Sequence, residues 1–487
     1  MTEKIKELYP VFEKARDNLV LIDKNLKGLN FRNIPLRFHE LIRDNQKKLA
    51  TAVTFLQESG GFYPLFLQLL GDKHPQRYLI LFQNRDELRP TGGFIGSYLI
   101  VDINEGRVVK TQYRDVYETD GQAHREIAPP SYFGKITSRW RLRDANFSPD
   151  FPTSAQNILW FLEEEGGPTV DHVIAIDQTV AEKILEVTGP LNSPYLNQKI
   201  TAENLSLLLS YAVEKKIAPG PTPKQIVFDL IPEIEKKLVE ENLFPSLLTN
   251  VLSLLPKKHL LFYSRNQEAQ DLFSSLGVTE EIYQNQEKED FLEVVSISLG
   301  GNKSDAYVKE KITHITDVTE EGTIQNTLTL TRHHDYNLQT SKKIKEVIGQ
   351  EVPSWLEKVL GEGINQNFIK VYVPKGSKLV AAKGVPLEDV ITTEDLGKTV
   401  FAFVSKVSPG KTTRATLIYE LPFRLNVNSI DNYRLFVQKQ PGKKPPLLIK
   451  KISLPQGRKI FQKIPSQQKT VLDTNYRFSS VIGREEI

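Results

Sequence analysis

The stretch LFQNRDELRPTGGFIGSYLIVDINEGRV, Leu81–Val108, decides how the first half of the chain is interpreted. Its centre, Thr91–Ser97, contains Gly92, Gly93 and Gly96 and resembles a glycine loop that cradles a phosphate. In a nucleotide-binding loop the glycines lead from a strand directly into a helix, whose N-terminal amides receive the phosphate. Here they lead into SYLIVDI, which alternates like a strand, and neither a Lys-Ser/Thr pair nor G-x-G-x-x-G spacing is present. The pattern therefore excludes a nucleotide-binding loop.

Two interpretations of these glycines remain. In the first, Gly92, Gly93 and Gly96 permit a tight turn or a bulge beside a packed strand. In the second, they belong to an irregular loop whose backbone amides line a pocket together with Arg89. The second interpretation requires that Arg89 and the other polar residues near the loop converge on one cavity.

The segments around the loop alternate between strand and helix patterns. Apolar runs predict strands at 78–82, 98–103, 108–113, 173–176 and 259–264, and helical spacing predicts helices at 152–164, 180–187 and 224–240. This alternation is typical of an α/β domain with a mixed sheet covered by helices, which we place at 76–295. The acidic, apolar-poor stretch 280–290 is the expected linker to the second half.

The ends of the chain have different periods. In the segment 1–75, three- and four-residue apolar spacing predicts a helical hairpin, broken near Asn30–Pro35. After about Gly300 the period becomes two, and strand-like runs separated by Gly- and Pro-containing turns predict a β-sandwich at 296–425. A basic β-ribbon at 426–487 follows. The expected fold class is therefore α/β followed by all-β.

Composition limits the possible functions. The chain has 487 residues, with 63 Lys and Arg against 60 Asp and Glu, and this near-balance argues against a nucleic-acid partner. It has no cysteine, which excludes disulfides and thiolate chemistry. No apolar run is long enough to span a membrane, and the first residues do not resemble a secretion signal.

One segment departs from the overall charge balance. Residues 434–469 contain ten Lys or Arg and no Asp or Glu. This local positive field predicts binding of an anionic envelope polymer or of anionic lipid headgroups. The alternative is a solvated lysine-rich edge that prevents strand-to-strand aggregation.

Arginines and carboxylates gather in the loops and strand ends of the α/β region, where ligands bind in open α/β sheets. They are Arg89, Arg114, Asp115, Glu118, Asp120, Arg139, Arg141, Arg143, Asp144 and Asp150. Such a set could hold a Mg²⁺-pyrophosphate, with carboxylates on the metal and guanidinium groups on the phosphate oxygens. The alternative is a salt-bridge network that pins a long loop.

Five motifs resemble a bacterial envelope family known only as domain of unknown function 4012. They are RYLILFQNRDELRPTGGFIGSYLIV, DVYETDGQ, RDANFSPDFPTSAQNILWFLEEEGG, VDHVIAIDQTVAEKILEVTGPL and GGNKSDAYV, and the resemblance runs in order from Tyr78 to about Leu421. The family name implies no activity. Its members typically carry a transmembrane helix before a helical segment like 3–58, so the resemblance implies an extracytoplasmic location. We therefore expect this chain to be an ectodomain, or to start after an upstream anchor.

A remoter resemblance is to the LytR-CpsA-Psr family, which transfers glycans from polyprenyl-pyrophosphate carriers to the cell wall. The order of strands, Arg114-Asp115, VDHVIAIDQTVAEKILEVTGPL and ITAENLSLLLSYAVEKK is similar. The resemblance implies an α/β/α sandwich with a buried lipid pocket. It places Arg114 and Asp115 on that family's Arg-Asp pair, and Lys215 and Lys224 on two of its arginines.

Two positions depart from that family's pattern. Val213 stands where the LytR-CpsA-Psr family has a further arginine, and the loop near Gly96 replaces an aspartate that binds magnesium there. A lost arginine removes a bidentate phosphate clamp that lysine cannot reproduce. A lost carboxylate weakens a Mg²⁺ site. The resemblance therefore supports the fold better than the activity.

The residues and resemblances together give one set of candidates. The catalytic candidates are Arg114 and Asp115, the ligand-binding candidates are Arg89, Gly92, Gly93, Arg143, Lys215 and Lys224, and the Mg²⁺ candidates are Asp115 and Asp144. The first expected function is binding, or transfer by a glycan phosphotransferase, of a polyprenyl-phosphate-linked glycan or similar lipid phosphate at the cell envelope. The second is a non-catalytic envelope scaffold or adhesion module that retains the fold without the phosphotransferase site.

Overall fold

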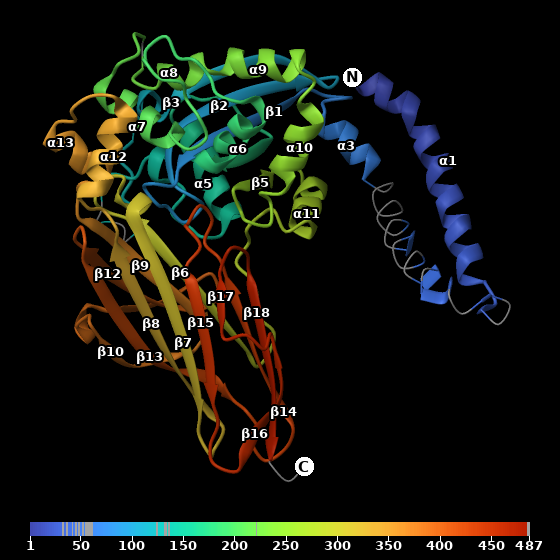
Figure 1. Cartoon of the computed structure of the whole chain (residues 1–487), viewed down its shortest axis with the longest axis vertical. Coiled ribbons are helices and arrows are strands. Elements are labelled where there is room, and N and C mark those ends of the chain that lie inside the picture. Colours follow the sequence, from blue (N-terminus) through green and yellow to red (C-terminus); the bar gives the residue numbers. More distant parts are fainter. Residues whose placement is uncertain are drawn as a thin grey trace.

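The structure of the protein is a computed structural model. It describes residues 1–31, 34–35, 38–40, 42–43, 46, 49–50, 53, 62–122, 125–130, 134, 137–220 and 222–484. A helical N-terminal segment leads into a mixed α/β unit, and the C-terminal half consists mainly of strands (Figure 1). The predicted order of α/β followed by β structure is therefore confirmed.

The N-terminal segment begins with one long helix, α1 (Thr2–Lys27), which projects away from the α/β unit (Figure 1). Its first turns are tied to the rest of the chain, because Lys6 Nζ lies 2.6 Å from Asp72 Oδ1. Helix α3 (Tyr63–Leu69) precedes the first strand. Much of the second helix of the predicted hairpin lies outside the described residues. Within the part of the chain that the structure describes, no helix is long and apolar enough to cross a membrane.

The α/β unit is built on one mixed sheet with the strand order β3-β2-β1-β4-β5. The strands are β1 (Gln76–Asn84), β2 (Phe94–Asn104), β3 (Arg107–Asp115), β4 (His172–Asp177) and β5 (Leu260–Ser264). Strand β1 is parallel to β4, and the other neighbours are antiparallel. All five strands coincide with predicted runs, which are rich in β-branched or aromatic residues. Burial alternates most clearly along β1.

Helices cover both faces of this sheet. On one face α5 (Phe151–Glu164) buries Ile158 and Leu162 against Leu79 and Leu81 of β1. On the other face Val180 of α6 packs with Leu260 of β5, beside α10. The helices of this unit are α4 (Val116–Asp120), α5, α6 (Gln178–Thr188), α7 (Leu205–Lys215), α8 (Gln225–Asp229), α9 (Ile231–Glu240), α10 (Phe244–Leu252) and α11 (Gln267–Ser275). The predicted helix 224–240 is interrupted at Leu230, before Pro232 in the first turn of α9.

Two sheets form the C-terminal half, with strand orders β10-β13-β8-β7-β15-β17 and β11-β12-β9-β6-β14-β18-β16. The strands are β6 (Glu289–Ser298), β7 (Val308–Val318), β8 (Thr323–His334), β9 (Asn365–Pro374), β10 (Lys378–Lys383), β11 (Ile391–Asp395), β12 (Lys398–Val407), β13 (Thr412–Arg424), β14 (Asp431–Gln438), β15 (Leu447–Ser453), β16 (Arg458–Ile464), β17 (Lys469–Val471) and β18 (Tyr476–Arg484). Buried residues of both sheets, such as Leu328 and Phe401, form one hydrophobic core, so the sheets pack face to face.

The strands do not follow the predicted domain bounds. The boundary between 295 and 296 falls inside β6, and the segment 426–487 contributes strands to both sheets. Residues 280–290 do connect the two halves, yet Glu280 and Asp290 are buried. Because Lys258 Nζ lies 2.6 Å from Glu280 Oε1, this connection is fixed against the α/β unit instead of forming an exposed linker.

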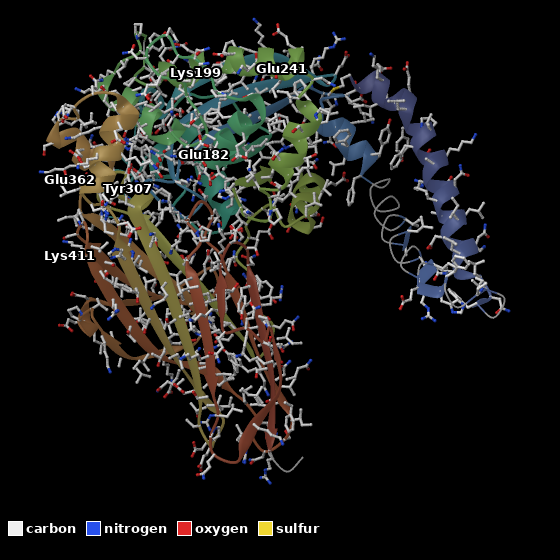
Figure 2. The ribbon with its side chains drawn as sticks, in the orientation of Figure 1. Glu182, Lys199, Glu241, Tyr307, Glu362 and Lys411 are labelled. Carbon is white, nitrogen blue, oxygen red and sulfur yellow. The ribbon has the colours of Figure 1, made fainter. Side chains whose placement is uncertain are left out.

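The two halves share an extensive junction. Asp305 Oδ2 accepts a hydrogen bond of 3.0 Å from the backbone N–H of Leu88, and the Gln440 amide donates one of 3.1 Å to the carbonyl of Arg89. Helices α12 (Leu338–Ile348) and α13 (Ser354–Glu357), inserted between β8 and β9, share a hydrophobic core with α7. Tyr307 and Glu362 mark this end of the junction in Figure 2. The α/β unit therefore sits directly on one end of the sandwich.

Candidate functional site

The glycine loop packs against other residues of the same chain. The backbone N–H of Gly93 donates to Gln83 Oε1 at 3.0 Å, and the Asn146 amide donates to the Gly93 carbonyl at 2.9 Å. A Cβ on Gly93 would lie 2.2 Å from the Asn84 carbonyl oxygen, and one on Gly442 would lie 2.0 Å from that of Gly92. The glycines thus permit close backbone packing at the junction. Their contact with a ligand stays a prediction.

Arg89 and Arg143 meet at one carboxylate. Arg89 Nη2 lies 3.3 Å from Asp144 Oδ1, and Arg143 Nε lies 3.5 Å from Asp144 Oδ2. Arg89 is buried and also donates to the Ser298 carbonyl at 3.2 Å. Two of the predicted phosphate-binding arginines therefore do converge, with their charges shared by Asp144.

Asp115 and Lys224 form a second buried ion pair. Lys224 Nζ lies 2.8 Å from Asp115 Oδ1 and also donates to the Gly96 carbonyl. The other oxygen of Asp115 accepts from the Thr222 hydroxyl at 2.6 Å, and Oδ1 also accepts from the N–H of Tyr117, so Asp115 begins helix α4 as its N-cap. These contacts bring together two candidate residues that are far apart in the sequence.

Tyr117 links the two ion-pair systems. Its ring has Arg143 Cζ 5.4 Å and Lys224 Nζ 5.1 Å from the centroid, within the range of cation–π contact. The Tyr117 side chain is exposed, whereas the Arg143 and Lys224 side chains expose only 29% and 13% of their surface. We call Tyr117, Arg143, Lys224, Asp115 and Asp120 the Tyr117 corner.

Titratable groups in and beside the Tyr117 corner have shifted pKa values. Burial raises the pKa of Asp120, although Arg143 Nη1 lies 2.6 Å from Asp120 Oδ2. Burial and, to a smaller extent, repulsion by Asp120 raise the pKa of Glu165 to about 7. Burial also lowers the pKa of Lys224. These shifts follow from desolvation of charge.

Sequence reasoning missed several members of this region. Tyr117, Glu165 and Thr222 are not among the candidates that the sequence predicts. Glu165 is the last glutamate of the run EEEGG, which is typical of an exposed helix end, and only its burial beside Asp120 distinguishes it. Tyr117 lies in DVYETDGQ, one of the motifs that carry the family resemblance, so that motif was the available signal.

Arg114 and Lys215 lie apart from this assembly. Arg114 is exposed while Asp115 is buried, because consecutive residues of a strand point to opposite faces of the sheet. The two do not act as a side-by-side pair here. Lys215 lies at the end of α7 with its Nζ 6.0 Å from the Trp355 ring centroid. Their predicted catalytic and ligand-binding roles stay predictions.

The residues present do not form a ready Mg²⁺ site. Each Asp144 oxygen faces an arginine, and both Asp115 oxygens already accept hydrogen bonds. No group of three or more His, Cys, Asp or Glu side chains suited to a metal occurs among the described residues. Magnesium would have to displace these cations or donors, and Mg²⁺ binding stays a prediction.

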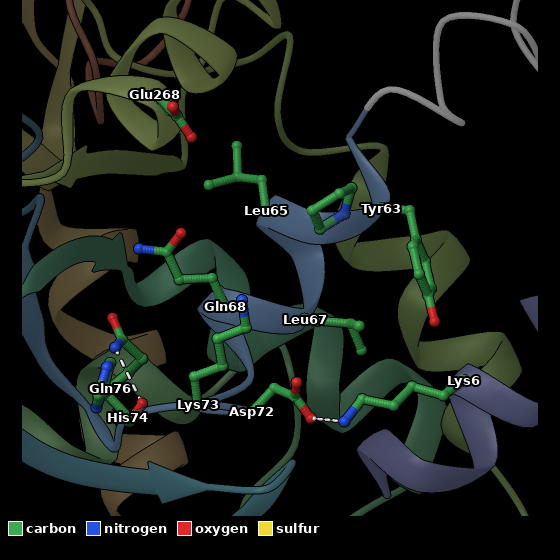
Figure 3. A pocket seen from close by; sticks show the side chains of 11 residues that line it. Lys6, Tyr63, Leu65, Leu67, Gln68, Asp72, Lys73, His74, Gln76 and Glu268 are labelled. Atoms are coloured by element: carbon green, nitrogen blue, oxygen red, sulfur yellow. Dashed lines mark hydrogen bonds and ion pairs between the residues drawn. The ribbon is translucent and has the colours of Figure 1, made fainter.

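A cavity of about 690 Å³ lies elsewhere, between the N-terminal helices and the α/β unit (Figure 3). Its lining includes the ion pair of Lys6 and Asp72, together with Gln68, His74 and Glu268. None of the predicted site residues lines this cavity. The hollow space and the charge cluster are therefore separate features of the protein.

Comparison with known proteins identifies one segment. Residues 73–213 match the family Protein of unknown function (DUF4012). The DUF4012 match contains the first four of the five sequence motifs and most of the Tyr117 corner, which confirms the resemblance for this segment. No curated protein matches the chain.

Solved structures offer only distant likenesses. A putative nutrient binding protein of Legionella pneumophila is 8% identical with a TM-score of 0.22, covering 40% of this chain and 71% of that one. A protein of Streptococcus agalactiae is 13% identical with a TM-score of 0.28, covering 57% and 90%. A transcriptional regulator of Enterococcus faecalis is 9% identical with a TM-score of 0.25, covering 58% and 92%. Likenesses this weak carry no functional argument.

Proposed function

We propose that this protein binds a polyprenyl phosphate or a similar lipid phosphate at the extracytoplasmic face of the bacterial membrane, without transferring it. The observation that carries the proposal is the Tyr117 corner, where two cationic side chains flank one exposed aromatic ring. The Arg143 guanidinium suits phosphate oxygens, and the exposed ring offers apolar contact to the first carbons of an isoprenoid chain. The envelope location follows from the family resemblance.

The fold is compatible with this role. Helices on both faces of the mixed sheet agree with the α/β/α sandwich that the LytR-CpsA-Psr resemblance implies. The resemblance places Asp115 on that family's Arg-Asp pair and Lys224 on one of its arginines. The contact between Asp115 and Lys224 supports a common site for these two positions.

Binding without transfer is favoured by the state of the carboxylates. Asp115 is occupied as a helix cap and as the partner of Lys224, and Asp144 is paired with both Arg89 and Arg143. Val213 replaces an arginine of the transferase pattern. A group held in so many interactions is poorly placed to accept a proton or a metal during transfer.

The second candidate is a non-catalytic envelope scaffold. It is favoured by Arg89, which is buried between Asp144 and the Ser298 carbonyl of the β-sandwich. In this function the arginine and carboxylate network stabilises the junction between the α/β unit and the sandwich. The Tyr117 corner would then have no ligand.

Titration calorimetry with a short polyprenyl phosphate in detergent separates the two candidates. Tyr117→Ala and Arg143→Lys each remove one element of the Tyr117 corner, and each should weaken binding about tenfold, as loss of a desolvated cation–π or charge-assisted contact predicts. Lys406→Gln is the matched control, since Lys406 is an exposed lysine of β12 in the β-sandwich and should bind as the parent does. Equal binding by all variants, or no binding by the parent, would favour the scaffold.

A further inference from the structure

The core of the β-sandwich contains a polar cluster with no access to water. Its members come from five strands of both sheets and are exposed by 1% or less. They are Asp290 on β6, His314 and Thr316 on β7, Asn326 on β8, Tyr433 on β14 and Lys450 on β15. Burying a lysine and an aspartate in an apolar core is unfavourable unless the groups have a specific use or strong compensating contacts.

The contacts connect an amine to a carboxamide through one hydroxyl group. Lys450 Nζ lies 2.5 Å from Thr316 Oγ1, and the Thr316 hydroxyl donates to Asn326 Oδ1, also at 2.5 Å. The amine and the amide are therefore separated by a single hydroxyl group. His314 Nδ1 and the Tyr433 hydroxyl also accept from Lys450, at 2.9 and 3.1 Å.

A carboxyl group is positioned on the other side of the amide. Asn326 Nδ2 donates to Asp290 Oδ2 at 2.9 Å, and the Tyr433 hydroxyl donates to the same oxygen at 2.5 Å. Burial lowers the pKa of Lys450 and raises that of Asp290. The neutral amine and the protonated carboxyl, the forms that aminolysis of an amide requires, are thereby favoured.

We infer that Lys450 and Asn326 join in an intramolecular isopeptide bond, with Asp290 as the group that transfers the proton. The lone pair of the neutral Lys450 amine attacks Cγ of Asn326, and the Thr316 hydroxyl stabilises the charge that develops on Oδ1. Asp290 gives its proton to Nδ2 and regains one from the attacking nitrogen. The bond between Cγ and Nδ2 breaks, and ammonia leaves. An amine and a carboxamide become a secondary amide and ammonia, so no oxidant, metal or co-reactant is needed.

The position of the bond gives it a structural purpose. It would tie β15 to β8 across the intervening strand β7, in a chain that has no cysteine with which to form a disulfide. A covalent link between residues so far apart in sequence restricts the unfolded chain strongly. The C-terminal strands, which complete both sheets, would then be held covalently to the sandwich.

The test is the intact mass of the purified, denatured full chain. The expected mass is lower than the sequence mass by one molecule of ammonia, and tryptic digestion should give a branched peptide that joins 312–332 to a fragment with an uncleaved Lys450. Folded protein at the full sequence mass, without the branched peptide, would overturn the inference. This measurement needs no variant, so it does not depend on whether substitutions allow folding.

Variants then identify the participants. Lys450→Met, Asn326→Leu and Asp290→Asn should each retain the full mass of their own sequence. Lys370→Met is the matched control, because Lys370 is another lysine buried in the sandwich and its Nζ lies 2.8 Å from Asp395 Oδ2. This control should lose ammonia as the parent does. A branched peptide in Asp290→Asn at the parental yield would remove the role of Asp290 while leaving the bond.

Discussion

Lys224 Nζ lies 2.8 Å from Asp115 Oδ1, and the two side chains expose only 13% and 4% of their surface. This ion pair joins two segments that are far apart in sequence. Asp115 lies at the end of β3, immediately before α4, and Lys224 lies at the start of α8. The ion pair also positions Lys224 in the Tyr117 corner, because the same lysine lies against the Tyr117 ring. The charge pair therefore serves stability and site geometry together.

Lys224→Met leaves the Asp115 carboxylate buried without its cation. We expect the free energy of unfolding to fall by about 3–5 kcal/mol, the usual result of removing one partner of a buried pair. Urea unfolding of the full chain measures this. The double variant Lys224→Met, Asp115→Asn should recover part of the loss, because the carboxamide still accepts from Thr222 but carries no charge. A loss below about 1 kcal/mol in the single variant would show that the pair is not buried as described.

Gly93→Ala tests the packing of the glycine loop. The added Cβ would lie 2.2 Å from the Asn84 carbonyl oxygen, which is backbone and cannot move aside cheaply. We expect a loss of about 1–3 kcal/mol or more in unfolding free energy. Gly28→Ala is the matched control, since its nearest neighbour would be 3.5 Å away. Equal stability of both variants would contradict the close contact.

Glu165 predicts a dependence of stability on pH. Burial raises its pKa from 4.5 to about 7, so the folded protein binds the proton more tightly than the unfolded chain. This contribution to stability is complete below pH 4.5 and is lost as the pH rises to about 7, with a slope of at most about 1.4 kcal/mol per pH unit. Glu165→Gln should remove this part of the slope between pH 5 and 8, as measured by urea midpoints. Parallel profiles for parent and variant would contradict the shift.

The basic C-terminal segment predicts salt-dependent binding to anionic surfaces. Lys439, Lys443 and Lys450 are buried, so the exposed positive charge is smaller than the sequence suggests. Lys459 lies on the edge strand β16 and is exposed, beside exposed Phe461. Lys459→Gln should weaken binding to phosphatidylserine vesicles about fivefold at low salt. Unchanged vesicle binding by Lys459→Gln would favour the alternative of a solvated edge.

The sequence predicted the elements of the fold better than their assembly. Strands such as β1 and β4 have strong β-branched and aromatic runs, and α5 has a clear apolar stripe after its Asp150 cap. The start of strand β6 is not predicted, because its sequence is acidic and acidic residues are usually exposed. In the structure Glu289, Asp290 and Glu293 of this strand are buried. Sandwich strands joined across long sequence separations, such as β6 with β14, could not be paired from local patterns.

The candidate site was predicted in part for similar reasons. Arg89, Arg143 and Asp144 are candidates because they lie in loops of the α/β region, and their side chains do meet. Arg114 was grouped with Asp115 by sequence, although alternation along β3 separates their side chains. Glu165 and Thr222 enter the region only through tertiary packing, which neither periodicity nor motif spacing contains.

The lipids that accompany the purified protein show most directly whether the Tyr117 corner holds a lipid phosphate. The full chain and its Tyr117→Ala variant would be expressed in a bacterium and purified in parallel, and their lipid extracts compared by mass spectrometry. We expect a polyprenyl phosphate with the parent and a strongly reduced amount with the variant. No polyprenyl phosphate in repeated parental preparations, or equal amounts with both proteins, would contradict it.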